Sequence, residues 1–192
     1  QAPQKDKHYI LFADVAGSVT DDTFNARMAS AEERDGSDFS AAVLIDSATG
    51  QICATYHGRP ALDQYAEDLA RLAHTYNRAL LAVERNSVGQ AVLLMLTTTF
   101  NYSNLYRPRH MNSTRPDLDN KIGWITSQST RPRMLTALQM QIRDNPETIR
   151  CERLIEEIKT FVYDRRGNSG ADHGEHDYLV MAAGGAYAIM QE

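Results

Sequence analysis

Three acidic residues that lie far apart in the chain each stand where an apolar segment ends or begins. Asp14 ends the run YILFAD, Glu84 ends ALLAVE, and Asp177 precedes YLVMAAG. Carboxylates at strand ends and at a helix start can converge where a sheet exposes its ends and a helix packs across it. Carboxylate oxygens suit divalent cations such as Mg²⁺, and these ions act on phosphate groups. If the fold brings the three acids together, they form a metal site for phosphate chemistry.

Each acid also has a simpler explanation when it is taken alone. Asp14 can be a turn residue, Glu84 a solvated strand end, and Asp177 a helix-capping carboxylate that the helix dipole favours. An unpaired charge in an apolar strand is costly, however, and the joint placement of three acids at element ends favours the metal hypothesis. Asp38, just before FSAAVLID, is a candidate fourth acid, although the turn sequence DGS before it explains it equally well.

A second group of metal-ligand residue types occurs in the segment ADHGEHD. Its His173 and His176 lack the partner pair that a zinc finger needs, so a hard-cation site is favoured over zinc. Either histidine could assist as an auxiliary acid or base. The chain has no lysine and glycine spacing of a phosphate-cradling loop, which argues against a nucleotide-binding motor.

The segment from residue 105 to 133 is basic, although the whole chain has a net charge of −5. It holds six basic residues and two acidic ones, with Tyr102, Tyr106 and Trp124 interleaved or adjacent. Such a stretch is often a solvated loop, but it could also contact phosphates while the rings pack against sugars or bases. The candidates for gripping a DNA backbone are Arg107, Arg109, Arg131 and Arg133.

Apolar runs and turn residues predict the elements that position these groups. Residues 8–15, 38–46 and 51–57 are expected to form a three-stranded meander, followed by a helix over 62–76. RALLAVE predicts a buried strand and the segment after Asn86 a helix. The change from meander to strand, helix and strand predicts an α/β fold with a mixed central sheet and helices on both faces.

The second half of the chain predicts shorter strands and three helices. NLY and GWIT are expected to be short strands, and a helix is expected from Thr130. ERLIEEIKTFVYD should pass from helix into strand, and the last helix should begin near His176. Residues 19–36, with weak periodicity between two strands, are expected to be an inserted surface loop.

Length and composition indicate one ordinary globular domain. A chain of 192 residues can bury roughly 70% of its unfolded surface without a metal or disulfide staple. Cys53 and Cys151 show no zinc or disulfide pattern, which favours a reducing, intracellular setting. No run approaches the ~20 apolar residues that cross a bilayer. The start at Gln1 suggests a processed chain or a domain cut from a longer protein.

Several segments, taken in order and spacing, resemble the nuclease domain of the tailed-phage large terminase subunit. They are ADVAGS with GSDFSAAVLID, YNRALLAVERNSVGQAVLLML, NLYRP, GWITSQSTRPRMLTAL, LIEEIKTFVYD and GEHDYLVMAAGGA. The resemblance spans nearly the whole chain and implies one nuclease domain over 1–192, with an RNase H-like fold.

The resemblance also implies a site in which Asp14, Glu84 and Asp177 are catalytic and bind two Mg²⁺ or Mn²⁺ ions. Asp14 would bridge the ions, and Asp38 matches an additional acid near the metals in some members. The chain departs from the family at Tyr178, where a second aspartate is usual. The segment between Asp14 and Asp38 is also longer than the usual loop.

The implied activity is that of a divalent-metal-dependent endodeoxyribonuclease, which cleaves double-stranded DNA during viral genome packaging by two-metal-ion hydrolysis. The implied partners are an ATPase domain of the parent protein, the portal and the small terminase subunit. The expected location is the host cytoplasm, at the procapsid portal, with no membrane contact. One alternative is an RNase H-like nuclease for hybrid or branched substrates. Another is a non-catalytic module that docks on DNA or the portal.

Overall fold

A computed structural model describes residues 1–16, 39–108, 121–163, 169–172 and 176–192. The expected insertion at 19–36 and the candidate residues Asp38, Arg109 and His173 lie outside the described residues. None of the helices in these ranges combines the length and hydropathy of a bilayer-spanning helix.

A mixed four-stranded sheet forms the centre of the molecule. Strands β1 (Tyr9–Asp14), β2 (Ser40–Asp46) and β3 (Ile52–Gly58) pair in antiparallel fashion, and β4 (Leu80–Val83) pairs in parallel with β1. The strand order is β3-β2-β1-β4. The predicted meander and the change to a strand–helix pattern are both confirmed.

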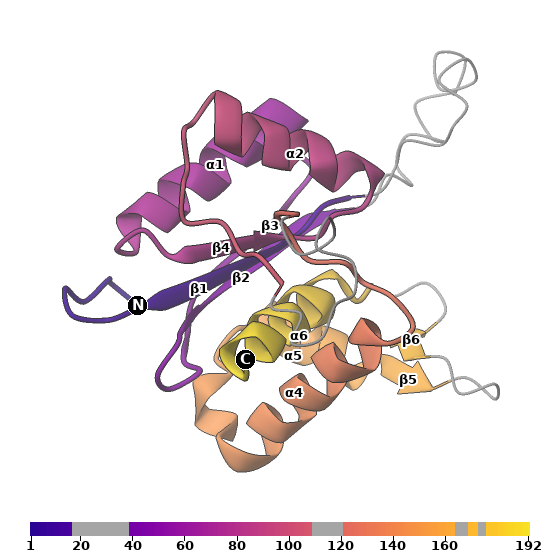
Figure 1. Ribbon diagram of the computed structural model, residues 1–192. Coiled ribbons are helices and arrows are strands. Elements are labelled where there is room, and N and C mark those ends of the chain that lie inside the picture. Colours follow the sequence, from indigo (N-terminus) through magenta and orange to yellow (C-terminus); the bar gives the residue numbers. More distant parts are fainter. Residues whose placement is uncertain (17–38, 109–120, 164–168, 173–175) are drawn as a thin grey trace, which may run out of the picture.

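Helices cover both faces of this sheet, as the sequence predicts (Figure 1). On one side lie α1 (Leu62–Thr75) and α2 (Ser87–Thr98). The elements on the other side are the helices α4 (Thr130–Asp144), α5 (Glu152–Lys159) and α6 (Tyr178–Met190). A short 3₁₀ turn, η3 (Pro146–Thr148), follows α4, and β5 (Phe161–Tyr163) forms a small hairpin with β6 (Ser169–Ala171).

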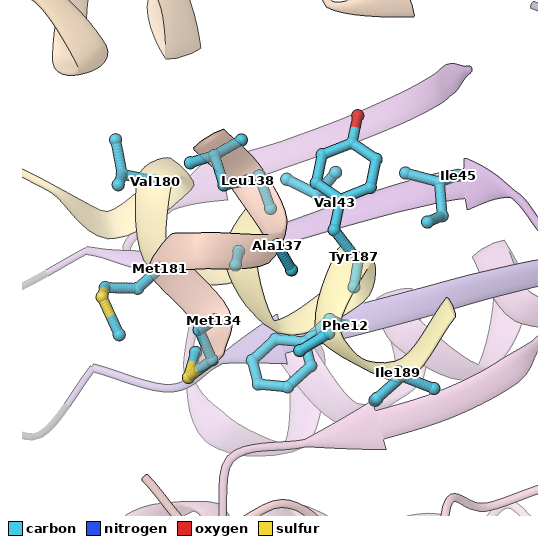
Figure 2. Close-up of a cluster of buried hydrophobic side chains, with 14 of the residues drawn as sticks. Phe12, Val43, Ile45, Met134, Ala137, Leu138, Val180, Met181, Tyr187 and Ile189 are labelled. Atoms are coloured by element: carbon cyan, nitrogen blue, oxygen red, sulfur yellow. The ribbon is translucent and has the colours of Figure 1, made fainter. Parts of the chain in front are cut away.

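Side chains of the two central strands alternate between two separate cores. Ile10 and Phe12 of β1 join the core of α4 and α6, whereas Leu11 and Ala13 join the core of α1 and α2. Figure 2 shows the α6 side, where Phe12, Val43 and Ile45 of the sheet lie among side chains of α4 and α6. Because the central strands are buried on both faces, they read as continuous apolar runs in the sequence.

The predicted strands NLY and GWIT are wrong in extent, because each makes only one isolated bridge. Leu105 bridges Leu81, and Trp124 bridges Glu84. The positive φ of +96° at Gly123 turns the chain out of the extended conformation directly before Trp124. The bridges still satisfy the outer edge of β4, where the Trp124 N–H donates to the Val83 carbonyl at 2.9 Å.

Helix α6 lies unusually close to its neighbours because two glycines face them. A Cβ added at Gly185 would overlap the Phe12 ring, and one at Gly184 would lie 3.0 Å from the Met134 carbonyl oxygen of α4. Both separations would be shorter than an ordinary van der Waals contact. The Gly184–Gly185 pair therefore sets the distance between α6, the sheet and α4.

We expect Gly185→Ala to destabilise the protein by about 1–3 kcal/mol, because the added methyl group overpacks a rigid aromatic core. This cost should outweigh the ~1 kcal/mol by which alanine favours a helix over glycine. The measurement is urea unfolding. Gly58→Ala is the control, since its Cβ would meet the Tyr56 ring at an ordinary 3.5 Å. Equal stability of Gly185→Ala and wild type would contradict this account of α6 packing.

Candidate functional site

The parallel pairing of β1 and β4 brings two of the three acids side by side. Ala13 pairs with Val83, and the Glu84 N–H donates to the Ala13 carbonyl at 2.8 Å. Asp14 directly follows Ala13, and Glu84 directly follows Val83. The two acids therefore stand on neighbouring strands, which lie about 4.8 Å apart. Phe12 and Ala82, two residues earlier, both belong to the α6-side core. Alternation therefore directs both carboxylates toward the face that α6 covers.

The third acid stands at the start of α6, on that same face. Asp177 is the N-cap residue of the helix. Asp14, Glu84 and Asp177 line one pocket of 220 Å³. The other lining residues are Val15, Ala16, Phe39, Asn86, Thr126, Arg131, Tyr178 and Met181. The structure thus places the three acids around one cavity.

Asp177 does not use its side chain to cap α6, so the interpretation of this residue as a capping carboxylate is wrong. The capping acceptor is Glu157 of α5. Its Oε2 accepts from the N–H groups of Leu179 at 2.7 Å and Val180 at 3.2 Å. Because Glu157 satisfies these amides, the carboxylate of Asp177 is available to the pocket.

Glu157 is a buried acid that the sequence interpretation missed. It is only 8% exposed, and burial raises its pKa to about 7; the charge of Asp177 also raises it, while the two amide hydrogen bonds lower it. Its position three residues after buried Leu154 was the available signal, since that spacing places Glu157 on the apolar face of a helix.

A second missed residue, Asn86, ties the two strand ends together. Its Oδ1 accepts from the Gly89 N–H at 2.7 Å, and its Nδ2 donates to the Val15 carbonyl at 3.0 Å. The asparagine thus caps α2 and joins the turn after Glu84 to the segment after Asp14. Gly89 lies so close to the Glu84 carbonyl oxygen that an added Cβ would overlap it.

The basic candidates are dispersed rather than gathered into one strip. Arg131 lines the pocket, where its Nη2 lies 3.3 Å from Asp177 Oδ2 and donates to the Ser169 carbonyl at 2.9 Å. Arg133 pairs with Glu192 at 3.1 Å, and Arg107 is exposed. His176 is exposed as well and does not line the pocket.

The aromatic residues of the basic segment belong to the core. Tyr102, Tyr106 and Trp124 are 2%, 4% and 3% exposed. The expectation that these rings pack against sugars or bases is therefore wrong. They close the outer edge of β4, where apolar rings cover the sheet beside the isolated bridges.

The chemistry of the pocket fits a hard divalent cation, since its acids offer only carboxylate oxygens. In the ranges that the structure describes, no three His, Cys, Asp or Glu side chains stand close enough to form a ready metal-binding group. The guanidinium of Arg131 instead provides the positive charge next to Asp177. Cation binding here would need the acids to draw together and Arg131 to move.

No protein-family model and no curated protein matches the sequence. Solved structures do resemble the fold. The large terminase nuclease of thermophilic phage G20c with bound magnesium matches with a TM-score of 0.65 and 17% identity, over 98% of this chain and 84% of that one. The same nuclease with bound cobalt gives the same values.

The large terminase nuclease domain of Thermus phage P74-26 is also similar. It gives a TM-score of 0.62 and 15% identity, over 97% of this chain and 82% of the other. At these identities the likeness shows the fold. The predicted RNase H-like architecture, a mixed sheet with helices on both faces, is confirmed.

Glu157→Gln should flatten the dependence of stability on pH. The folded pKa of Glu157, about 7, lies above its ordinary value of 4.5, so the folded state holds this proton more tightly. The resulting stability is fully present below pH 4.5 and is lost as the pH rises through 7. At ~1.4 kcal/mol per pKa unit, wild type should lose about 3 kcal/mol over this range through this residue. Glutamine keeps an acceptor for the two amides and does not titrate.

The measurement is urea unfolding of wild type and variant at several pH values. Glu156→Gln is the matched control, because Glu156 is the adjacent residue but is exposed and pairs with Lys159 at 2.8 Å. A Glu157→Gln profile parallel to that of wild type would contradict the raised pKa of the buried carboxyl group.

Proposed function

We propose that this chain is a divalent-metal-dependent nuclease that hydrolyses phosphodiester bonds of double-stranded DNA, and that it acts in viral genome packaging. One observation carries the proposal: acids from the end of β1, the end of β4 and the start of α6 line a single pocket. The shared fold supports it, because similar structures are terminase nucleases, including one with bound magnesium and one with bound cobalt.

Asp14, Glu84 and Asp177 are the residues that would hold Mg²⁺ or Mn²⁺. Asp14 is the proposed shared ligand of two ions, because it ends a central strand beside Glu84. Glu84 and Asp177 would each complete the coordination of one ion. When bound, the ions supply Lewis acidity and lower the pKa of a water molecule that attacks the phosphorus. Asp38 is a candidate additional ligand outside the described residues.

Arg131 links this metal site to the substrate. In the structure its guanidinium group neutralises Asp177 at 3.3 Å. A cation at Asp177 would take over that neutralisation and release the guanidinium, which could then bind the DNA phosphate in the same pocket. Arginine suits this role because its planar fork pairs with two phosphate oxygens. Arg107, Arg109 and Arg133 are proposed to grip the backbone farther away.

Further residues have proposed supporting roles. His176, which precedes Asp177 but does not line the pocket, and His173, beyond the described residues, are proposed to assist proton transfer to the leaving oxygen. Tyr178 offers no second carboxylate after Asp177, so the site depends on one acid at the start of α6. The ATPase domain of the parent protein, the portal and the small terminase subunit are the proposed assembly partners.

Asp14→Asn and Asp177→Asn are each expected to lower plasmid nicking in Mn²⁺ or Mg²⁺ by at least about 100-fold, since each removes an anionic ligand from the metal site. Asp172→Asn is the control, because Asp172 is exposed and lies outside the pocket lining. Nicking by either pocket variant at the wild-type rate would refute the assignment.

The alternative substrates are separated in the same assay. Linear duplex, branched DNA and RNA–DNA hybrid are cut side by side, and preference for the hybrid or branched form would favour the alternative nuclease. Calorimetric titration with Mn²⁺ tests the docking alternative. A complete lack of heat from metal binding would favour a non-catalytic module.

Arg131→Ala should separate metal binding from cleavage. Loss of the guanidinium removes the charge that competes for Asp177, so Mn²⁺ affinity measured by calorimetry should rise about threefold or more. Cleavage should nevertheless fall about 10-fold or more, because the phosphate loses its arginine contact. Weaker Mn²⁺ binding by Arg131→Ala would contradict the competition between arginine and cation.

A further inference from the structure

Two stacked ring pairs lie side by side at the edge of the pocket. Phe39 and Tyr178 line the pocket, with ring centroids 6.0 Å apart. Phe39 stacks on His57 of β3, at a centroid distance of 4.3 Å and an interplanar angle of 25°. Tyr178 stacks on His176 in a similar way, at 5.0 Å and 21°. These four rings are called the aromatic shelf below.

The aromatic shelf holds two arginines that are distant in the sequence. The guanidinium carbon of Arg59, just after β3, lies 4.1 Å from the centroid of the Phe39 ring. Arg153, in the first turn of α5, donates from Nη1 to Nδ1 of His57 at 3.0 Å. Both arginines are exposed. The stacked pair Phe39–His57 therefore lies against two exposed arginine side chains.

The hydrogen bond to Arg153 requires a neutral His57, because an arginine side chain can only donate. The surroundings favour that form: burial lowers the pKa of His57, and the positive charges of Arg153, His176 and Arg59 lower it further. Since a neutral ring holds Arg153, this contact leaves the positive charge of the guanidinium uncancelled.

The register of the sheet relates this site to the acids. His57 pairs with Ala41, and Ala41 pairs with Asp14, so the three residues form one row across β3, β2 and β1. His57 thus lies two strands from Asp14, or about 10 Å at a strand separation of about 4.8 Å. That distance matches roughly three nucleotides of one strand, at about 3.4 Å of helix axis each.

We propose that Arg59 and Arg153, held in place by Phe39 and His57, form a binding site for backbone phosphates of the DNA strand that enters the pocket. The identity of the ligand rests on the proposed nuclease function. Arginine offers the donor fork that phosphate oxygens accept, and orientation by the rings reduces the entropy lost on binding. The two arginines stand just after β3 and in the first turn of α5, apart from the basic segment at residues 105–133.

The test is the affinity of the purified protein for a short fluorescent DNA duplex, measured by anisotropy in EDTA so that no cleavage occurs. Arg59→Ala and Arg153→Ala should each weaken binding about five- to tenfold. Each should also reduce the slope of log affinity against log salt by about one. Arg71→Ala, which removes an exposed arginine from α1 on the opposite face, is the matched control.

Two further variants test the positioning by the aromatic shelf. Arg153→Lys keeps the charge and should restore the salt slope but only part of the affinity, because lysine lacks the planar fork. His57→Ala keeps Arg153 but removes the ring that accepts its hydrogen bond. The affinity for the duplex should therefore fall, while the salt slope stays near that of wild type.

Two outcomes would overturn the proposal. In the first, the Arg59→Ala and Arg153→Ala variants bind the duplex as tightly as Arg71→Ala. In the second, the wild-type protein does not bind the duplex. The result is independent of catalysis. Arginine-dependent binding by a protein that fails to cut would leave this site in place and remove the nuclease assignment. Normal cutting with unchanged binding by both alanine variants would remove this site alone.

Discussion

The distance between α6 and β1 governs the geometry of the whole pocket. Asp14 is fixed by the sheet, whereas Asp177 is fixed by the helix, so the two carboxylates face one cavity only if the helix lies close to the strand. Gly185 permits that approach, because any side chain at this position would meet the ring of Phe12. A packing contact deep in the core therefore determines where an acidic residue lies at the surface.

The start of α6 meets a second requirement, which is an acceptor for its first N–H groups. An N-cap aspartate normally supplies that acceptor from its own side chain. Here Glu157 reaches across from α5 and accepts two of these bonds. The protein buries an ionisable group in order to leave Asp177 facing the pocket. Such a local departure from the usual capping rule is characteristic of functional sites.

Much of the architecture could be predicted because strongly apolar runs leave few alternatives. The central strands and the two-sided burial followed directly from segments such as YILFAD and AAVLID. The acids at the strand ends could be proposed as neighbours, since parallel strands end at one edge. Their separation could not be predicted, because it depends on Gly185 against Phe12 and on the ion pair of Arg131 with Asp177.

The wrong predictions have a common physical origin. The polar or aromatic character of a residue does not reveal whether its side chain is buried. Trp124 and Tyr106 stand among arginines in the sequence but pack into the core. Glu157 has a charged neighbour, Glu156, yet only one of the two faces the interior. Whether such a side chain is buried depends on residues that are distant in the sequence, and the local sequence does not identify those residues.

Capping from α5 also joins α5 and α6 through space, in addition to the chain that connects them. The Leu179 and Val180 amides at the start of α6 donate to Glu157, which precedes that connection. The acceptor of these two N–H groups therefore lies outside the β5–β6 hairpin. A change in the length of the hairpin would leave this contact between α5 and α6 in place, whereas Ser169 of β6 accepts from Arg131 at 2.9 Å and so contributes to the site. The position of Asp177 at the start of α6 thus depends on α5 as well as on the chain that leads to it.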